Sequence, residues 1–297
     1  MSVVIFIFML VPLAITTGFG KEHVTKIPQR LKFGKFYRYE EINTFVETLA
    51  TRYPTKLKVR KIGNSSEGRD VKVVQLSSGG SGKRPVIFVL AGIHASDRVT
   101  PALGLYIVQQ LLFNNKNKDL VDYVDWFVLP LLNPDGYEYR RLKDSQWIKS
   151  RSNSSGTNCI GVSLDRNFDF HWNGPFSEPE TIAVRNLIME QKGRVKLYLE
   201  LQGTGSEKLA IIANSALKTG GDNSYKIGSY ATLLSPVSGT AMDWMKGIIG
   251  VPLTYTVKIT NPPGRHAIPE KFIKSTIANF FPAVRAFGTY IKQHYKI

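Results

Sequence analysis

Short apolar runs recur along the chain, and each has the length of a buried β-strand. Longer stretches with apolar residues at helical spacing lie between them. The strand-like runs are Val86–Leu90, Trp126–Leu132, Val195–Leu201 and Leu209–Ala213, and the helix-like stretches are Tyr39–Tyr53, Pro101–Phe113, Glu180–Gln191 and Ile273–Tyr295. This alternation predicts an α/β fold in which helices cover both faces of a central sheet.

The composition is that of one globular domain. Hydrophobic residues make up 43% of the 297 positions, which is enough for a large core. The sequence contains no internal repeat, low-complexity tract or linker-like stretch.

The first residues are typical of a signal peptide. The apolar run Val3–Ala14 is followed by the small residues Gly18 and Gly20, which suit cleavage before Lys21. The run is too short to span a membrane as a helix. We therefore expect a signal peptide at residues 1–20 and a soluble, secreted mature chain. The alternative is an uncleaved anchor, because no Lys or Arg precedes the apolar run.

The net charge of +16 is the second notable property of the composition. In a secreted protein it favours anionic partners such as sulfated glycans, acidic surfaces or acidic proteins. The basic residues are dispersed, and no Lys/Arg run with interleaved aromatic residues indicates nucleic-acid binding. A basic surface without any special role is the competing interpretation.

A possible metal site follows the first strand-like run. His94 and Asp97 are three residues apart, and such a pair at the end of a strand can bind one metal ion. This spacing arises often by chance, so the pair by itself favours a structural role over a metal site.

Several further motifs occur in a recognisable order. They are Ser65–Asp70, Leu132–Tyr137, Trp147–Ser152, Cys159–Phe168, Phe176–Thr181, Ser238–Trp244 and Gly264–Pro269. Together with His94 and Asp97, they resemble the zinc metallocarboxypeptidases of the carboxypeptidase A/B type. The resemblance runs from about Phe33 to the C-terminus. It implies a single domain over residues 33–297 with a mixed, mostly parallel sheet, after a short segment 21–32 without a full activation domain.

The resemblance also implies a zinc ion held by His, Glu and His, with a second Glu as general base. His94 and Asp97 match the first two ligand positions, but Gln202 matches the third and Lys258 matches the base. An amide oxygen is a poor zinc ligand, and an ammonium group repels the dication. We therefore expect no bound zinc. Lys258 is expected to pair with Asp97 in place of the metal, unless it points to solvent.

The family position that polarises the scissile carbonyl is Ile148, which offers no hydrogen bond. The pair that binds a substrate's terminal carboxylate corresponds to Asp165 and Arg166. Asp165 competes with such a ligand for Arg166, and an internal ion pair of Arg166 with Asp165 or Asp169 is the alternative.

Two further substrate positions are assigned by the same resemblance. The family's mobile tyrosine falls near Ser235, and the residue at the floor of the specificity pocket falls near Met242, which suits an apolar side chain.

Cys159 is the only cysteine, and the family position that it matches is usually in a disulfide. We expect a buried thiol because Ile160 and Val162 are apolar, and an intermolecular bond is the alternative. Asn64 and Asn153 begin glycosylation sequons in polar stretches.

Three functions remain open. The leading one is a secreted, catalytically inactive member of this family that binds a peptide or protein in its cleft and needs no cofactor. The second is an active zinc carboxypeptidase with an unconventional site. The third is an extracellular protein that binds anions or glycans through its basic surface.

Overall fold

The structure is a computed structural model that describes residues 30–79, 84–153, 158–172, 174–203, 237–259 and 268–295. Six strands form one sheet in these ranges, in the order β1-β2-β4-β3-β5-β6. They are β1 (Leu57–Asn64), β2 (Asp70–Leu76), β3 (Val86–Leu90), β4 (Asp125–Leu129), β5 (Val195–Gly203) and β6 (Leu253–Ile259).

The sheet is mixed and mostly parallel, as expected. Strands β4, β3, β5 and β6 pair in parallel, whereas β1 and β2 pair antiparallel to each other and β2 pairs antiparallel to β4. The carboxyl ends of the four parallel strands therefore lie at one edge, where ligand sites form in open α/β sheets.

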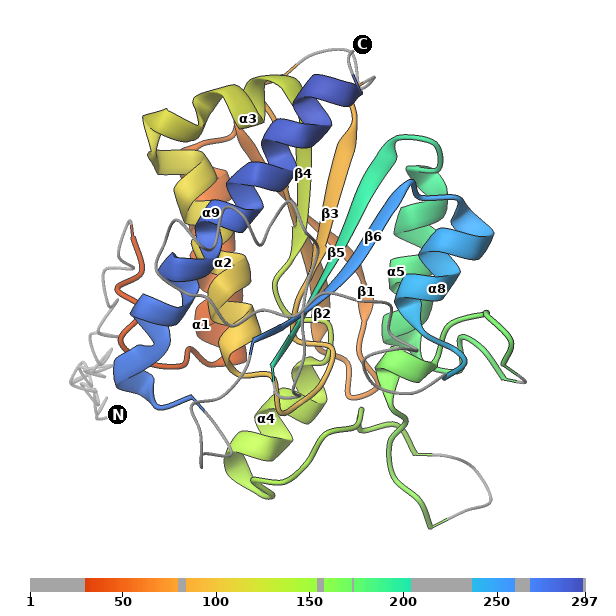
Figure 1. Cartoon of the computed structure of the whole chain (residues 1–297). Helices are drawn as coiled ribbons and strands as arrows, with labels where there is room; N and C mark the ends of the chain where they lie inside the picture. Colours follow the sequence, from red (N-terminus) through yellow and green to blue (C-terminus); the bar gives the residue numbers. More distant parts are fainter. Residues whose placement is uncertain are drawn as a thin grey trace, which may run out of the picture.

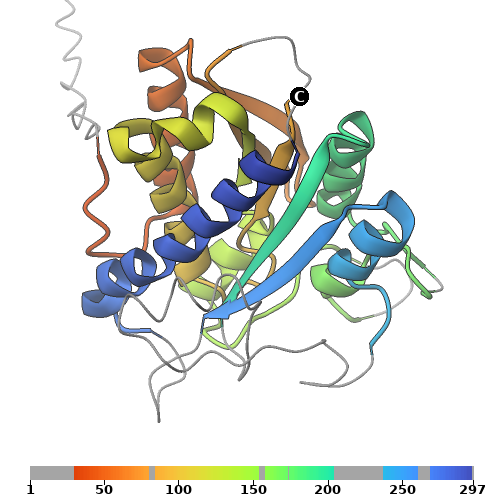
Figure 2. The ribbon, with the colours of Figure 1, turned by 45° about the horizontal axis from the view of Figure 1, so that its top comes forward.

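Helices cover both faces of the sheet (Figures 1 and 2). One face packs against α1 (Tyr39–Arg52), α2 (Val99–Phe113), α3 (Lys118–Tyr123) and α9 (Glu270–His294), and the other against α5 (Pro179–Glu190) and α8 (Ala241–Trp244). Helix α4 (Pro134–Leu142) follows β4. Short helical turns occur at η1 (Asn115–Asn117), η2 (Leu164–Arg166) and η3 (Met245–Ile249).

The alternation of side chains along β5 explains the two cores. Leu197, Leu199 and Leu201 belong to the hydrophobic cluster under α1, α2 and α9, whereas Tyr198 belongs to the cluster under α5 and α8. Successive residues of a strand point to opposite faces, so Glu200 shares the face of Tyr198.

The predicted helices agree with the structure to within three residues at each end, and β3 has the predicted bounds. Strand β4 ends at Leu129, before the predicted Leu132, because Pro130 has no N–H to continue the ladder. The hydrophobic pattern did not predict β1 and β2, which are rich in basic and polar residues. The predicted strand Leu209–Ala213 and the predicted signal peptide lie outside the described residues.

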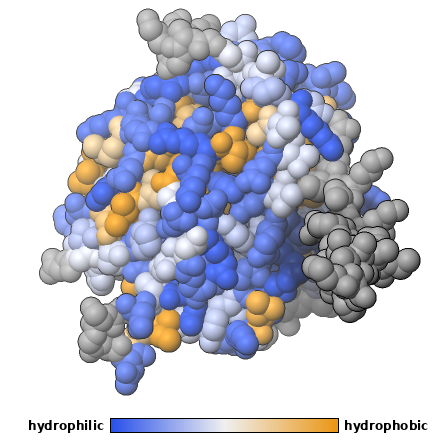
Figure 3. Space-filling model, turned by 180° about the vertical axis from the view of Figure 1, so that it is seen from behind, coloured by the Kyte–Doolittle hydropathy of each residue, from blue (hydrophilic) through white to orange (hydrophobic). Residues whose placement is uncertain are grey.

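The face of the molecule that Figure 3 shows carries many hydrophilic side chains. In the view of Figure 3, hydrophobic side chains are exposed in small groups among polar ones. Among the helices in the described ranges, none has the length and apolar character that a membrane crossing requires.

Candidate functional site

The loop after β3 carries His94 and Asp97. It turns at Gly92, whose φ of 63° is in the left-handed region, and a Cβ there would lie 2.6 Å from Leu131. The Asp97 carbonyl accepts a bond from the Thr100 hydroxyl (3.0 Å) at the start of α2. The turn and this bond fix the loop at the carboxyl edge of the sheet.

His94 lies between two carboxylates. Its Nδ1 is 3.1 Å from Oδ2 of Asp97, and its Nε2 is 3.1 Å from Oδ2 of Asp165. Burial by itself lowers the pKa of His94, but the two carboxylates outweigh it and raise that pKa well above its ordinary value. The two carboxylates therefore favour the charged form of the imidazole, in which both ring nitrogens donate.

Asp165 contacts two basic side chains, His94 and Arg166. Burial raises its pKa, but the hydrogen bond and charge of His94 outweigh burial and hold that pKa below its usual range. The Oδ2 atom that contacts His94 is also 3.5 Å from Nε of Arg166. The structure thus contains the internal pair between Arg166 and Asp165 that the sequence left open.

The Asn-Pro-Asp-Gly motif holds the loop after β3 against the segment that contains Ile148. Asn133 donates from Nδ2 to the carbonyls of Ile93 (3.3 Å) and Lys149 (3.0 Å), and the Ala95 N–H donates to the Ile148 carbonyl (2.9 Å). The Ile148 side chain is 49% exposed, so an apolar group stands where a polar one was expected from the resemblance.

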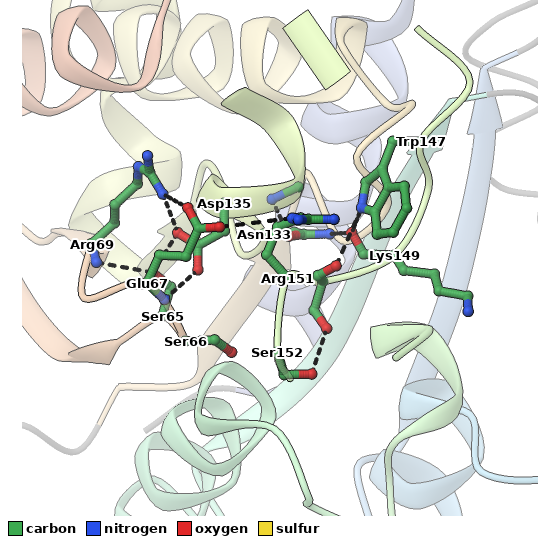
Figure 4. Close-up of polar contacts among 12 residues, drawn as sticks. Ser65, Ser66, Glu67, Arg69, Asn133, Asp135, Trp147, Lys149, Arg151 and Ser152 are labelled. Atoms are coloured by element: carbon green, nitrogen blue, oxygen red, sulfur yellow. Dashed lines mark hydrogen bonds and ion pairs between the residues drawn. The ribbon is translucent and has the colours of Figure 1, made fainter. Parts of the chain in front are cut away.

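Asp135 of the same motif fixes the loop between β1 and β2 (Figure 4). Its buried carboxylate accepts bonds from the Ser65 hydroxyl, the Glu67 N–H and the Arg69 guanidinium, each at 2.7 Å. Asp135 therefore joins two of the sequence motifs into one hydrogen-bonded scaffold beside the site.

Gln202 and Lys258 are adjacent in the sheet. They are register partners in the parallel pair of β5 and β6, so their side chains leave the same face. The side-chain amide of Gln202 donates to Glu200, which is also bound by the Tyr198 hydroxyl at 2.6 Å. Lys258 is half-buried.

Glu200 was missed by the sequence reasoning. It is buried, and desolvation raises its pKa. The signal was present, because Glu200 and Gln202 are two residues apart in an apolar strand and so share a face. A carboxylate thus lies beside the expected ligand position.

The expected specificity residue lines a small recess. Met242 on α8 lies there with its sulfur 3.6 Å from the Thr256 hydroxyl. The other lining residues are Asp165, Glu200, Gln202 and Thr240. The volume of about 10 Å³ between these described side chains is that of one water molecule.

Comparison with known proteins decides the family. The family model described as zinc carboxypeptidase matches residues 42–210. Carboxypeptidase B of Astacus astacus is 31% identical over 88% of this chain and 98% of its own length. The chain belongs to the zinc carboxypeptidase family.

Other relatives of this carboxypeptidase-family chain agree. Carboxypeptidase O of Bos taurus is 28% identical, with 87% of this chain and 79% of that protein covered. The crystal structure of carboxypeptidase A from Helicoverpa armigera has a TM-score of 0.81 at 26% identity, covering 89% and 75% of the two chains. The bovine thrombin-activatable fibrinolysis inhibitor shares the fold, with a TM-score of 0.80, 24% identity, and 88% and 99% coverage.

The residues at the metal positions of this carboxypeptidase-family chain do not fit zinc. The contacts of His94 do not decide this, because a zinc ion at Nδ1 would replace a proton there while Asp165 accepts from Nε2. Gln202 offers a neutral amide where zinc favours imidazole, thiolate or carboxylate. Among the described residues, no group of three His, Cys, Asp or Glu side chains is arranged to hold a metal ion.

The structure bears differently on the expectations for Asp97, Ser235 and Cys159. Asp97 contacts His94, and its expected ion pair with Lys258 stays a prediction. Ser235 lies outside the described residues. The expected burial of Cys159 is wrong, because this residue is exposed beside Ile160, which is itself 39% exposed.

Both sequon asparagines are exposed. Asn64 ends β1, where its side-chain amide donates to the Gly68 carbonyl at 2.9 Å. Asn153 forms an isolated antiparallel bridge with Ile160. Their glycosylation stays a prediction.

Proposed function

We propose that this chain is a secreted, catalytically inactive member of the zinc carboxypeptidase family that acts by binding a peptide or protein. The proposal treats residues 1–20 as a signal peptide, residues 21–32 as a short leading segment and residues 33–297 as the carboxypeptidase-like domain. Glycosylation at Asn64 and Asn153 belongs to the same proposal.

The observation that carries the proposal is the pairing of Gln202 with Glu200 next to Lys258. A base must hold a lone pair near the attacking water, and the ammonium of Lys258 has none while it is charged. The third zinc ligand of the family corresponds to Gln202, whose neutral amide is a poor ligand and already donates to Glu200. Two essential parts of the catalytic unit are therefore absent together, and such parts act as a unit.

The position that polarises the scissile carbonyl argues in the same direction. Loss of the oxyanion arginine at Ile148 removes a contribution that is commonly worth two to three powers of ten in rate.

Binding without catalysis is supported by the fold. A structural neighbour of this chain, the bovine thrombin-activatable fibrinolysis inhibitor, has been solved in complex with tick carboxypeptidase inhibitor. The hydrogen bonds of Asn133 and Asp135 hold the loops at the carboxyl edge in place, which supports a surface that is ordered for a ligand. Because the described side chains leave little volume in the Met242 recess, we propose that the ligand is bound by contacts across the surface of the site.

The catalytic part of the proposal is tested by metal content and hydrolysis together. The purified protein is dialysed against micromolar zinc, zinc per chain is measured by mass spectrometry, and peptides ending in apolar residues are assayed. An active carboxypeptidase of the family, treated in parallel, is the positive control. We expect no stoichiometric zinc and no release of C-terminal residues. One zinc per chain with chelator-sensitive release would make the protein an enzyme.

The binding part is tested separately with an immobilised peptide library. We expect wild-type protein to retain a subset of peptides and Arg166→Gln to lose part of that subset, because Arg166 is a cation next to the recess. If wild-type protein retains no peptide, the cleft has no binding role of this kind.

A further inference from the structure

A second cavity lies far from the candidate site, at the other end of the sheet. It is formed by the end of β2, the C-terminal end of α2 and helix α3, and we call it the α2–α3 cavity. Leu76, which lines it, pairs with Trp126 near the start of β4, whereas His94 follows the end of β3. Figure 1 shows α3 at the end of the molecule opposite α4.

The floor of the α2–α3 cavity is apolar. Leu76, Leu111 and Val121 are buried and Leu112 is half-buried, and all four line the cavity. Its volume of about 150 Å³ is that of cavities that accept a benzene-sized molecule. The remaining lining residues are polar and belong to its rim: Lys56, Ser78, Asn114, Asn115, Lys118 and Asp122.

The charges of the rim favour an anion. Lys118 is paired with Asp122 at 2.5 Å, so these two residues largely neutralise each other. Lys56 is exposed, and the ion pairs formed within the described part of the chain do not include it. One cation of the rim therefore remains available to a ligand that occupies the apolar floor.

The surroundings extend this positive field. Lys116 is in η1 between the rim residues Asn115 and Lys118, and its carbonyl accepts a bond from the Arg285 guanidinium of α9. Lys292 of α9 pairs with Asp119 of α3 at 3.1 Å. Basic side chains thus outnumber carboxylates around the cavity mouth, which attracts anions over the range of the Debye length.

We propose that the α2–α3 cavity binds a small amphipathic carboxylate, with a compact apolar body on the leucine floor and its carboxylate at Lys56. Burial of the apolar body provides most of the affinity, and the charge of Lys56 sets the preference for an acid over its neutral amide. The site is independent of the cleft, so it stands whether or not the protein binds peptides there.

The test uses 4-(trifluoromethyl)phenylacetate as the probe, followed by fluorine NMR during titration with the full chain. The neutral amide of the same acid is the ligand control. Lys56→Glu reverses the rim charge, and Lys58→Glu makes the same change at an exposed residue of β1 that does not line the cavity. Leu112→Phe reduces the volume, and Arg166→Gln reports on binding in the cleft.

We expect Lys56→Glu to weaken the acid at least about tenfold and Lys58→Glu to weaken it less than about twofold, because the charge effect falls with distance. Leu112→Phe should weaken acid and amide alike, and the amide should bind more weakly than the acid to the wild type. Equal losses in the two lysine variants, no binding at millimolar probe, or loss of binding in Arg166→Gln would overturn the proposal.

Discussion

His94 and Asp165 come from sequence motifs that are far apart in the chain, yet Nε2 of the imidazole lies 3.1 Å from Oδ2 of the carboxylate. This contact places a carboxylate beside Nε2, the ring nitrogen that Asp97 does not contact. It links His94, at the expected first metal position, to the expected carboxylate-binding pair. The three side chains form a continuous series of charged contacts from His94 through Asp165 to Arg166.

Replacing Asp165 with Asn should lower the pKa of His94, because one of the two stabilising charges is lost. The raised pKa adds stability below about pH 6.5, and this stability is lost as the pH rises through the folded-state value. Stability of the wild type should therefore fall over a wider pH range above 6.5 than stability of the variant. Histidine NMR titration and urea unfolding measure the two effects. An unchanged titration of His94 would contradict the contact.

Glu180 should make the protein less stable as the pH rises from about 4.5 to about 7. Burial raises the pKa of this carboxyl to about 7, and its Oε2 has no hydrogen-bond partner within the described part of the chain. Between these two pH values the folded state binds more protons than the unfolded state, so the free energy of unfolding falls as the pH rises. Above about pH 7 the ionised, buried carboxylate lowers the free energy of unfolding by up to about 3 kcal/mol. Glu180→Gln should remove this dependence.

The matched control for Glu180 is Glu40→Gln, since Glu40 is exposed in the first turn of α1 as Glu180 is buried in the first turn of α5. Urea unfolding is measured at several pH values from about 4.5 to about 8 for the three proteins, which covers the range between the unfolded and folded pKa of Glu180. If Glu180→Gln follows the wild-type pH profile, the buried carboxyl does not titrate in this range.

Histidine at 202 together with glutamate at 258 should restore zinc binding. Gln202→His supplies an imidazole ligand, and Lys258→Glu replaces a repelling charge with an attracting one, which is worth about three powers of ten or more in affinity. Gln202→His alone should gain less, because Lys258 remains. Zinc per chain after dialysis is the measurement. A double variant that takes up no zinc would show that these positions are mapped wrongly.

Asp135→Ala should destabilise the fold by about 2 to 4 kcal/mol, because the Arg69 guanidinium and the Ser65 hydroxyl lose a buried acceptor. Asp119→Ala is the control, since Asp119 forms a partly exposed pair with Lys292 and should cost less than about 1 kcal/mol. Denaturant unfolding measures both. Equal losses would mean that the Asp135 network is no stronger than a surface ion pair.

The net charge of +16 should make the protein bind heparin in a salt-dependent way. We expect retention at low salt and elution as the salt concentration rises, because exposed charges are screened. A simple sulfonate resin at the same salt concentrations is the control for unspecific retention. Passage through heparin without retention at low salt would count against an anion-binding role.

The sequence by itself indicated the family and the main helices, and it predicts which residues replace the catalytic ones. Strand β3 and the long helices follow from local hydrophobic periodicity, and the identities of Ile148, Gln202 and Lys258 need no coordinates. Local periodicity failed for β1, because edge strands with many basic residues lack a continuous apolar run. It also failed for Cys159, because apolar neighbours do not ensure burial in a loop.

Only the tertiary structure decided which distant side chains meet. The contact of Asp165 with His94, the binding of Glu200 by Gln202 and Tyr198, and the apolar floor beside Lys56 depend on how strands and helices pack. Side-chain spacing along one strand or helix is set by backbone geometry, so a sequence encodes it locally. The distance between two elements is set by the packing of the whole core, and no local pattern contains it.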